Sequence, residues 1–258
     1  LMDEVGVSYT VYDKEQIRQM EPGLKPVYSK AVVMDDTCGV SSPSALTDAY
    51  VALFKAAGGT VLRGDVSALS AAQDGWQVCF GEDVLHAENV VIAAGPWSAE
   101  VAAWLGYRIP MAWERGYHLH LQPGDGPQLG RAICDMDGGY AMVPTLHGVR
   151  ITSGVEIADR DASPNHDQII KSVASARDVH DMKDVIDDEP WMGRRPTLVD
   201  SLPMIDAAPR HGGLWFNFGH QHLGLSMAPG SALSIVAMIE GKEPPFDVNP
   251  FSATRFPI

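Results

Sequence analysis

One stretch near the start of the chain spaces its apolar side chains as a helix does. Behind Ser42, a residue type that caps helices, Pro43 stands at a favoured first helical position. Apolar residues then recur every three or four positions until Gly58 and Gly59 interrupt them. The pattern therefore predicts a helix over residues 43–57.

After this helix the pattern changes to that of strands. Residues 60–62 and 66–69 read as short strands, and residues 76–80 alternate apolar with polar side chains as a half-exposed strand does. Residues 89–95 are apolar on both faces, which is typical of a strand buried inside a parallel sheet. The region from residue 40 to residue 105 therefore predicts an α/β arrangement.

The middle of the chain alternates apolar and polar residues in three segments. They cover residues 116–121, 140–144 and 149–155, with turns between them, and predict an antiparallel sheet. Residues 164–188 return to a helical spacing.

The last part of the chain predicts a strand over residues 214–218, a turn with glycines over residues 219–224 and an apolar helix over residues 226–240. The expected fold class is therefore α/β (α+β), with both parallel and antiparallel sheets. Residues 1–7 read as the end of a helix followed by a turn, and the first residue is not methionine. We therefore expect a fragment of a longer protein.

Charge and cysteine content exclude several classes of protein. The chain of 258 residues has 19 Lys and Arg against 33 Asp and Glu, a formal net charge of −14. This charge argues against nucleic acid as a partner, because its binding needs clustered basic residues, and against a polybasic membrane patch.

No segment is expected to reach the roughly 18 apolar residues of a membrane-spanning helix. Three separated cysteines, Cys38, Cys79 and Cys134, predict neither a disulfide framework nor a thiolate metal site, but a reducing compartment such as the cytoplasm.

Two pairs of histidines have a spacing that could bind zinc. His118 and His120 are two residues apart, as are His220 and His222, so each pair would share one face of a strand. No third ligand of matching spacing stands nearby, so packing or supporting roles are favoured and no metal is expected. The acidic run over residues 181–189 reads as a solvated face.

The turn over residues 219–224 lies between a predicted strand and a predicted helix. Glycines there let backbone N–H groups approach a ligand closely, and the helix N-terminus carries a partial positive charge. This arrangement suits a phosphate or an electron-rich ring edge. It also suits a plain tight turn.

Two arginines stand in a predicted loop with a proline, residues 193–196. Arg194 and Arg195 could clamp a carboxylate with paired hydrogen bonds, or could balance the acidic run before them. Tyr140 could present its phenol to the same ligand or pack in the core. The glycines over residues 124–130 do not form a dinucleotide-binding fingerprint, because prolines interrupt the turn and no amphipathic helix follows.

Taken in order, these segments resemble the flavin-dependent D-amino acid oxidase and dehydrogenase family. The chain looks closest to the bacterial D-amino acid dehydrogenase branch, and glycine oxidase looks like a more distant relative. The resemblance covers nearly the whole chain and is most specific near its end. It is carried by Cys38–Leu46, Val90–Ser98, Arg115–Tyr117, Tyr140–Pro144, Gly154–Glu156, Gly193–Pro196, Asp200, Pro203, Gly219–Leu225, Pro250–Ser252 and Arg255–Phe256.

The resemblance implies two domains and a set of site residues. An incomplete, Rossmann-like FAD-binding domain would cover residues 29–105 and 191–258. An antiparallel-sheet substrate domain would cover residues 1–28 and 106–190. Arg195 would clamp the substrate carboxylate, with Tyr140 as its second partner. The residues implied to contact FAD are Val66, Ala94, Gly95, Trp97, Gly219, His220, His222, Leu223, Gly224 and Leu225.

The resemblance also implies a reaction. A hydride would leave Cα of a D-amino acid for flavin N5, and the imine would hydrolyse to a 2-oxo acid and ammonia. The electrons would pass to a quinone or the respiratory chain, which implies a cytoplasmic protein with peripheral contact to the inner membrane. One alternative is an amine oxidoreductase of the glycine, sarcosine or D-hydroxyproline type. The other is a non-catalytic fragment or subunit that needs a partner chain to hold FAD.

The chain departs from the family pattern in two places. It lacks the N-terminal βαβ unit with the glycine fingerprint that holds the FAD pyrophosphate, so we expect that unit in a missing N-terminal segment or on a partner chain. Asp206 stands where relatives usually have glycine. Its carboxylate would either crowd the flavin or face solvent.

Overall fold

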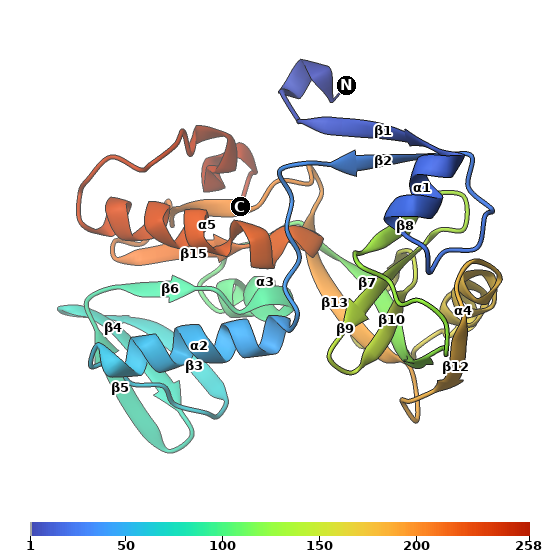
Figure 1. Cartoon of the computed structure of the whole chain (residues 1–258). Helices are drawn as coiled ribbons and strands as arrows, with labels where there is room; N and C mark the ends of the chain where they lie inside the picture. Colours follow the sequence, from blue (N-terminus) through green and yellow to red (C-terminus); the bar gives the residue numbers. More distant parts are fainter. Residues whose placement is uncertain (1) are drawn as a thin grey trace. The chain divides into compact units, whose positions relative to one another are not determined.

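The structure, a computed structural model, describes residues 2–258, and their contacts divide into two compact units. Unit one contains the residues up to Gly58, Gly116–Val155 and Ser163–Gly193. Unit two contains Gly59–Arg115, Glu156–Ala162 and Arg194–Ile258. Strands β7 (Met111–Pro123) and β13 (Trp191–Leu198) include residues of both units. Each unit combines helices with strands, so the predicted mixed α/β class is confirmed (Figure 1).

Unit one starts with two paired strands and two capped helices. Its elements are η1 (Asp3–Val5), β1 (Tyr9–Asp13), α1 (Lys14–Met20), β2 (Lys30–Met34), α2 (Pro43–Ala56), β8 (Ile133–Asp135), β9 (Tyr140–Thr145), β10 (Gly148–Thr152), α4 (Asp167–Val179) and β12 (Met182–Val185). β1 pairs with β2 in antiparallel fashion. Asp13 and Gln16 form a capping box at the start of α1. The Ser42 hydroxyl accepts a hydrogen bond from the Ala45 amide, which confirms the predicted start of α2.

The core of unit one is an antiparallel sheet with the strand order β7-β10-β9-β8. β7, β9 and β10 correspond to the three alternating segments, so the predicted antiparallel sheet is confirmed. α4 packs on β9 and β10. The hydrophobic cluster formed there includes Tyr117, Leu119, Leu121, Met142, Ile151, Ile169 and Ala176. Because side chains alternate along a strand, His118 and His120 of β7 lie on the opposite face of the sheet.

Unit two contains two sheets of three strands, with orders β14-β15-β6 and β3-β4-β5. Its elements are β3 (Val66–Ala72), β4 (Gly75–Phe80), β5 (Asp83–Ala87), β6 (Val90–Ile92), η2 (Gly95–Trp97), α3 (Ser98–Ala103), β11 (Glu156–Ile157), β14 (Met204–Ala207), β15 (Leu214–Phe218), η3 (Gln221–Leu223), α5 (Gly224–Ile239), η4 (Asn249–Phe251) and η5 (Ala253–Arg255). β15 pairs with β6 in parallel and with β14 in antiparallel fashion. Trp76, Ile92, Leu198 and Phe216 belong to its hydrophobic core.

Three predicted elements are wrong. Residues 60–62 are irregular and pair with no strand among residues 2–258. The helical pattern over residues 164–188 is divided, because the backbone becomes extended at His180 and β12 then pairs with β7. The predicted loop over residues 193–196 lies within β13, which also pairs with β7.

β6 is a parallel strand, as predicted, but it is not buried inside a sheet. Within the described part of the chain it pairs with β15 and no other strand, which leaves it at the sheet edge. Val91 is accordingly 38% exposed. An apolar strand at an open edge is unusual, since edges of this kind invite further pairing.

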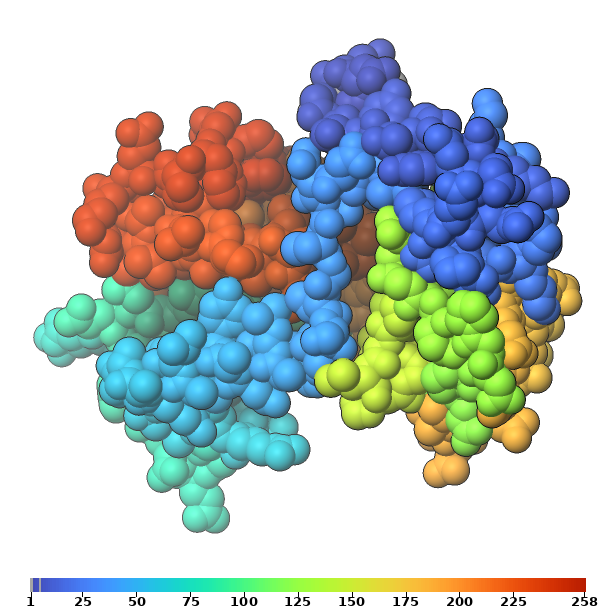
Figure 2. Space-filling view, in the orientation of Figure 1, coloured from blue at the N-terminus to red at the C-terminus, as the bar shows by residue number. Residues whose placement is uncertain are grey.

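α5 corrects the expectation that no segment could span a membrane. With η3 it forms a helical segment of 19 residues, Gln221–Ile239, which is long and apolar enough to cross a membrane. This finding rests on length and composition alone, and core helices of globular proteins meet the same criteria. α5 packs on β14 and β15. Ser231, Ser234 and Ile235 are buried, whereas Leu233 and Val236 are exposed. Figure 2 draws the surface of the C-terminal part of the chain in orange to red.

The compact units and the predicted domains differ most over residues 29–58. The prediction places this segment in the FAD-binding domain, whereas in the structure it belongs to unit one. The pairing of β2 with β1 accounts for the placement of residues 30–34. The functional roles of the two domains stay a prediction.

Candidate functional site

Two parallel strands of unit two lead into turns with glycines at their carboxyl ends. β6 and β15 pair through Ile92 and Phe216. β6 continues to Gly95, which has a φ of 53°, and then to α3; β15 continues to Gly219, which has a φ of 84°, and then to α5 (Figure 1). Ligands of open α/β sheets bind outside the carboxyl ends of parallel strands. These two turns therefore define the candidate site of unit two.

Gly219 places a third strand beside this site. A Cβ atom at Gly219 would lie 3.0 Å from Cγ of Leu198, so the turn packs directly on the end of β13. The neighbouring residues Thr197 and His220 form an antiparallel bridge. Arg195 stands two residues before Thr197 on β13, so the structure brings the predicted carboxylate clamp next to the predicted flavin turn.

The Arg195 guanidinium is the notable charged group on this strand. It is half-buried, and no hydrogen bond or ion pair holds it within residues 2–258. Burial lowers its pKa, while Glu114 opposes that effect. Its neighbour Arg194 instead donates from Nε to the Arg160 carbonyl oxygen at 2.7 Å. The same Nε lies 3.8 Å from Oδ1 of Asp161. Arg195 therefore keeps its donors available for an anion.

The predicted cofactor residues of unit two present apolar surface and open backbone donors. Val66, Trp97, Leu223 and Leu225 are between 43% and 49% exposed, which is high for large apolar side chains. Leu223 stands at the N-cap of α5 and makes no side-chain capping bond, so that helix end is free to face an electron-rich group. These features fit a planar cofactor with an apolar face and a polar edge.

The predicted cofactor residues differ in the element that holds them and in how far they are exposed. Val66 begins β3 and so lies on the other sheet of unit two, and Ala94 is an exposed residue just after β6. His220 is half-buried and its Nε2 lies 2.9 Å from the Ser231 hydroxyl; burial lowers its pKa. His222 is exposed. Contact of each with FAD stays a prediction.

Asp206 is half-buried and is held by hydrogen bonds within unit two. Its Oδ2 accepts hydrogen bonds from the Ser252 hydroxyl at 2.7 Å and from the Ala253 amide at 2.8 Å. The carboxylate therefore fastens β14 to η5 near the end of the chain. The C-terminal segment supplies these partners, which the local sequence does not show. The effect of this carboxylate on a bound flavin stays a prediction.

Tyr140 lies in unit one, within the hydrophobic core of that unit. Its hydroxyl is buried and has no hydrogen-bond partner among the described residues. Burial raises its pKa to about 12, so the phenol stays protonated and can donate. The nearby Tyr28 hydroxyl donates to Asp135 at 2.7 Å. A role of Tyr140 at a substrate carboxylate stays a prediction.

A second polar cluster lies on the open face of the unit one sheet. His120 receives a hydrogen bond at Nε2 from Nε of Arg150, 3.1 Å away, and its Nδ1 lies 3.0 Å from Oδ2 of Asp187. In this arrangement Nε2 accepts a hydrogen bond from arginine and Nδ1 faces the carboxylate. These contacts fix the orientation of the His120 ring, which has a supporting role.

The cluster was only partly visible in the sequence. The spacing of His118 and His120 placed both on one face of a strand, but Arg150 meets His120 only through the pairing of β10 with β7. No group of three or more His, Cys, Asp or Glu residues within residues 2–258 could hold a metal ion.

His118 makes the stability of the protein depend on pH. Burial, with Arg150 and His120 nearby, lowers its pKa to about 4. Between this value and the ordinary value near 6.5 the unfolded chain binds a proton that the folded chain does not, so stability falls as the pH falls through this window. We expect His118→Phe to make the melting temperature fall less between pH 7 and pH 5. His222→Phe controls for the loss of one exposed imidazole, and equal slopes in both variants would contradict the prediction.

Gly219 and Gly224 form a matched pair for testing the turn. Gly219→Ala places a Cβ against Leu198 at positive φ, so we expect a loss of about 1–3 kcal/mol in the free energy of unfolding. Gly224 has a φ of −54° and its Cβ would meet only ordinary contact at 3.6 Å. Gly224→Ala should be neutral or stabilise by up to about 1 kcal/mol. Urea denaturation measures both, and equal losses would show that the conformation of Gly219 carries no strain.

Comparison with known proteins agrees with this architecture. The sequence pattern of the DAO family, described as FAD dependent oxidoreductase, matches residues 1–238. The chain belongs to this family, and the family resemblance drawn from its motifs is confirmed.

Individual relatives are similar to the chain at modest identity. A D-amino-acid oxidase of Bradyrhizobium diazoefficiens is 29% identical over 99% of this chain and 62% of the relative. A D-amino acid dehydrogenase of Paramagnetospirillum magneticum is 30% identical over 80% of this chain and 50% of the relative. The crystal structure of glycine oxidase from Geobacillus kaustophilus matches with a TM-score of 0.86 at 24% identity, over 99% of this chain and 69% of that one. The chain thus spans between half and 62% of these two curated relatives.

Proposed function

We propose that unit two binds FAD and that the protein oxidises the Cα–N bond of a small amino acid, with D-amino acids as the substrate class. Membership of the DAO family supports the oxidoreductase class. The names of the two curated relatives support the substrate class. A quinone as final electron acceptor, and a cytoplasmic protein with peripheral membrane contact, belong to the same proposal.

The observation that carries this proposal is the position of Arg195. Its guanidinium is half-buried and makes no hydrogen bond or ion pair within residues 2–258, and its strand is joined through Thr197 to His220 of the glycine turn. A half-buried cation whose donors make no hydrogen bond has lost part of its hydration, and an anionic ligand would replace it. A substrate carboxylate matches the planar, two-pronged donor geometry of arginine.

Arg195 and the N-terminus of α5 would have separate roles in binding substrate and cofactor. Arg195 would hold the carboxylate and so orient Cα, and the open N-terminus of α5 would stabilise negative charge at the cofactor edge. When bound, FAD would supply the acceptor for the hydride, which carries two electrons away from Cα of the substrate. The oxidised substrate then needs only water to give a 2-oxo acid and ammonia.

The proposal is tested with the purified protein, titrated with FAD and then mixed anaerobically with substrate. We expect saturable quenching of flavin fluorescence, followed by bleaching of the visible flavin band on addition of D-alanine but not of L-alanine. Bleaching by glycine or sarcosine alone would replace the D-amino acid class with the achiral or N-methyl class. Absence of FAD binding would contradict the cofactor assignment for this chain.

A further inference from the structure

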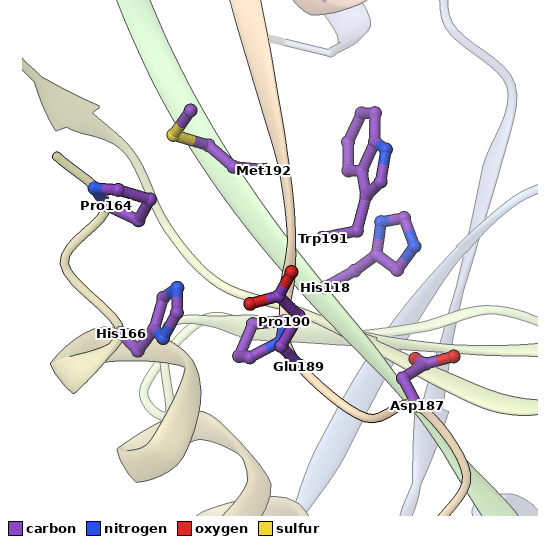
Figure 3. Close-up of a pocket in the computed structure, with 8 residues that line it drawn as sticks. All are labelled: His118, Pro164, His166, Asp187, Glu189, Pro190, Trp191 and Met192. Carbon is purple, nitrogen blue, oxygen red and sulfur yellow. The ribbon is translucent and has the colours of Figure 1, made fainter. Parts of the chain in front are cut away.

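Unit one contains a cavity of about 470 Å³ that the proposed function does not use. It lies where β7, the start of β13 and the segment before α4 meet (Figure 3). The residues on which the argument rests are His118, His166, Asp187, Glu189, Trp191 and Met192. A cavity of this size is suited to a small organic ligand.

An ordered aromatic side chain forms one wall of this cavity. The Trp191 indole stacks on the His118 ring, with centroids 4.7 Å apart and an interplanar angle of 25°. On the same strand Gly193 leaves room for the indole, since a Cβ there would lie 2.6 Å from two of its ring atoms. Trp191 nevertheless stays 58% exposed. The chain thus holds a large aromatic surface in place and leaves it open to a ligand.

The charged groups that line the cavity are acidic. Hydrogen bonds from His120 outweigh the effect of burial and keep the pKa of Asp187 below its usual range, so this carboxylate is ionised. Arg150 balances it in part through His120. Glu189 is exposed, and no hydrogen bond or ion pair engages it in the part of the chain that the structure describes.

Positive charge is missing from this lining. None of the residues around the cavity, all of them within residues 2–258, is lysine or arginine. His118 has a lowered pKa of about 4 and is neutral at physiological pH. One carboxylate without a partner therefore stands beside an open indole face and the thioether of Met192.

We propose that this cavity binds an organic cation: an ammonium group, held by Glu189 and Asp187, on a short apolar body that packs on Trp191 and Met192. Ammonium groups are attracted both to carboxylates and to the negative face of an indole ring. Met192 adds a flexible apolar contact that adapts to the shape of the ligand.

Calorimetric titration of the 258-residue chain with phenethylammonium tests the proposal. We expect saturable binding with one site, and no binding of 3-phenylpropionate, which has a similar apolar body and the opposite charge. Glu189→Gln should weaken binding at least fivefold. Glu243→Gln removes an exposed carboxylate of unit two and should leave the affinity unchanged.

A second pair of variants tests the aromatic wall. Trp191→Leu should weaken binding of phenethylammonium at least tenfold, whereas Trp104→Leu, at a 40% exposed tryptophan of unit two, should not. Equal binding of the anionic probe, or equal effects of Glu189→Gln and Glu243→Gln, would overturn the proposal. Because the readout needs neither FAD nor turnover, its failure is distinct from failure of the proposed oxidoreductase function.

Discussion

Replacing Arg195 by lysine is expected to lower kcat/KM for amino acid oxidation by about 10²- to 10³-fold, mainly by raising KM. Lysine keeps the positive charge but loses the planar pair of donors that matches a carboxylate. Since the guanidinium has no partner within the described residues, its loss should leave the fold intact. Steady-state kinetics of the flavin-loaded protein, with the melting temperature of each variant, measures both effects.

Arg194→Lys is the matched control for this experiment. Arg194 is the adjacent arginine, but its guanidinium is engaged by the Arg160 carbonyl and lies near Asp161. We expect the KM of Arg194→Lys to stay within about twofold of the KM of the unsubstituted protein, since the lost contacts are internal to unit two. A KM for Arg195→Lys that is unchanged with every amino acid tested would remove Arg195 from the carboxylate site. Equal rises in KM in both variants would show that the effect is not specific to Arg195 and would contradict the prediction.

Arg115→Met is expected to lower the free energy of unfolding by about 3–5 kcal/mol. The Arg115 side chain is 1% exposed, and its Nη2 and Nε lie 2.8 Å and 3.0 Å from Oε2 of Glu156. Its Nη1 also donates to the Ala162 carbonyl oxygen. The substitution leaves a carboxylate and a carbonyl without this charged donor in a partly buried place. Urea denaturation of the 258-residue chain measures the loss.

Two further variants show whether burial causes this effect. Glu100→Gln breaks the ion pair of Arg160 with a carboxylate that is 56% exposed, so it should cost less than about 1 kcal/mol. The double variant Arg115→Met with Glu156→Leu should recover much of the loss, because no unpaired charge remains. If Arg115→Met cost no more than Glu100→Gln, water would be replacing the lost donor and the prediction would be wrong.

Elements whose signals are local were predicted well. The Ser42-Pro43 pair marks the start of α2, and the alternation along β7, β9 and β10 shows which residues face the core. Caps and alternation depend on neighbours within a few residues, so they can be read along the chain. The ordered motifs likewise sufficed to identify the family.

Elements whose stability comes from distant partners were predicted poorly. The segment with Arg195 reads as a loop because of its glycine and proline, yet pairing with β7 makes it a strand. Asp206 finds its partners 46 and 47 residues away, in a C-terminal segment that no local pattern connects to it. β12 follows a helical spacing but pairs with β7.

The sequence by itself determined the residue types of the candidate site and their order: the glycine turn, the arginine pair and the alternating strands. Only the tertiary structure decided that Arg195 and not Arg194 keeps free donors, that Thr197 joins its strand to His220, and that Trp191 stands open beside Glu189. The physical reason is that availability depends on which partners reach a side chain in three dimensions. A sequence motif specifies a group and its charge, whereas burial and competing hydrogen bonds determine whether that group can bind a ligand.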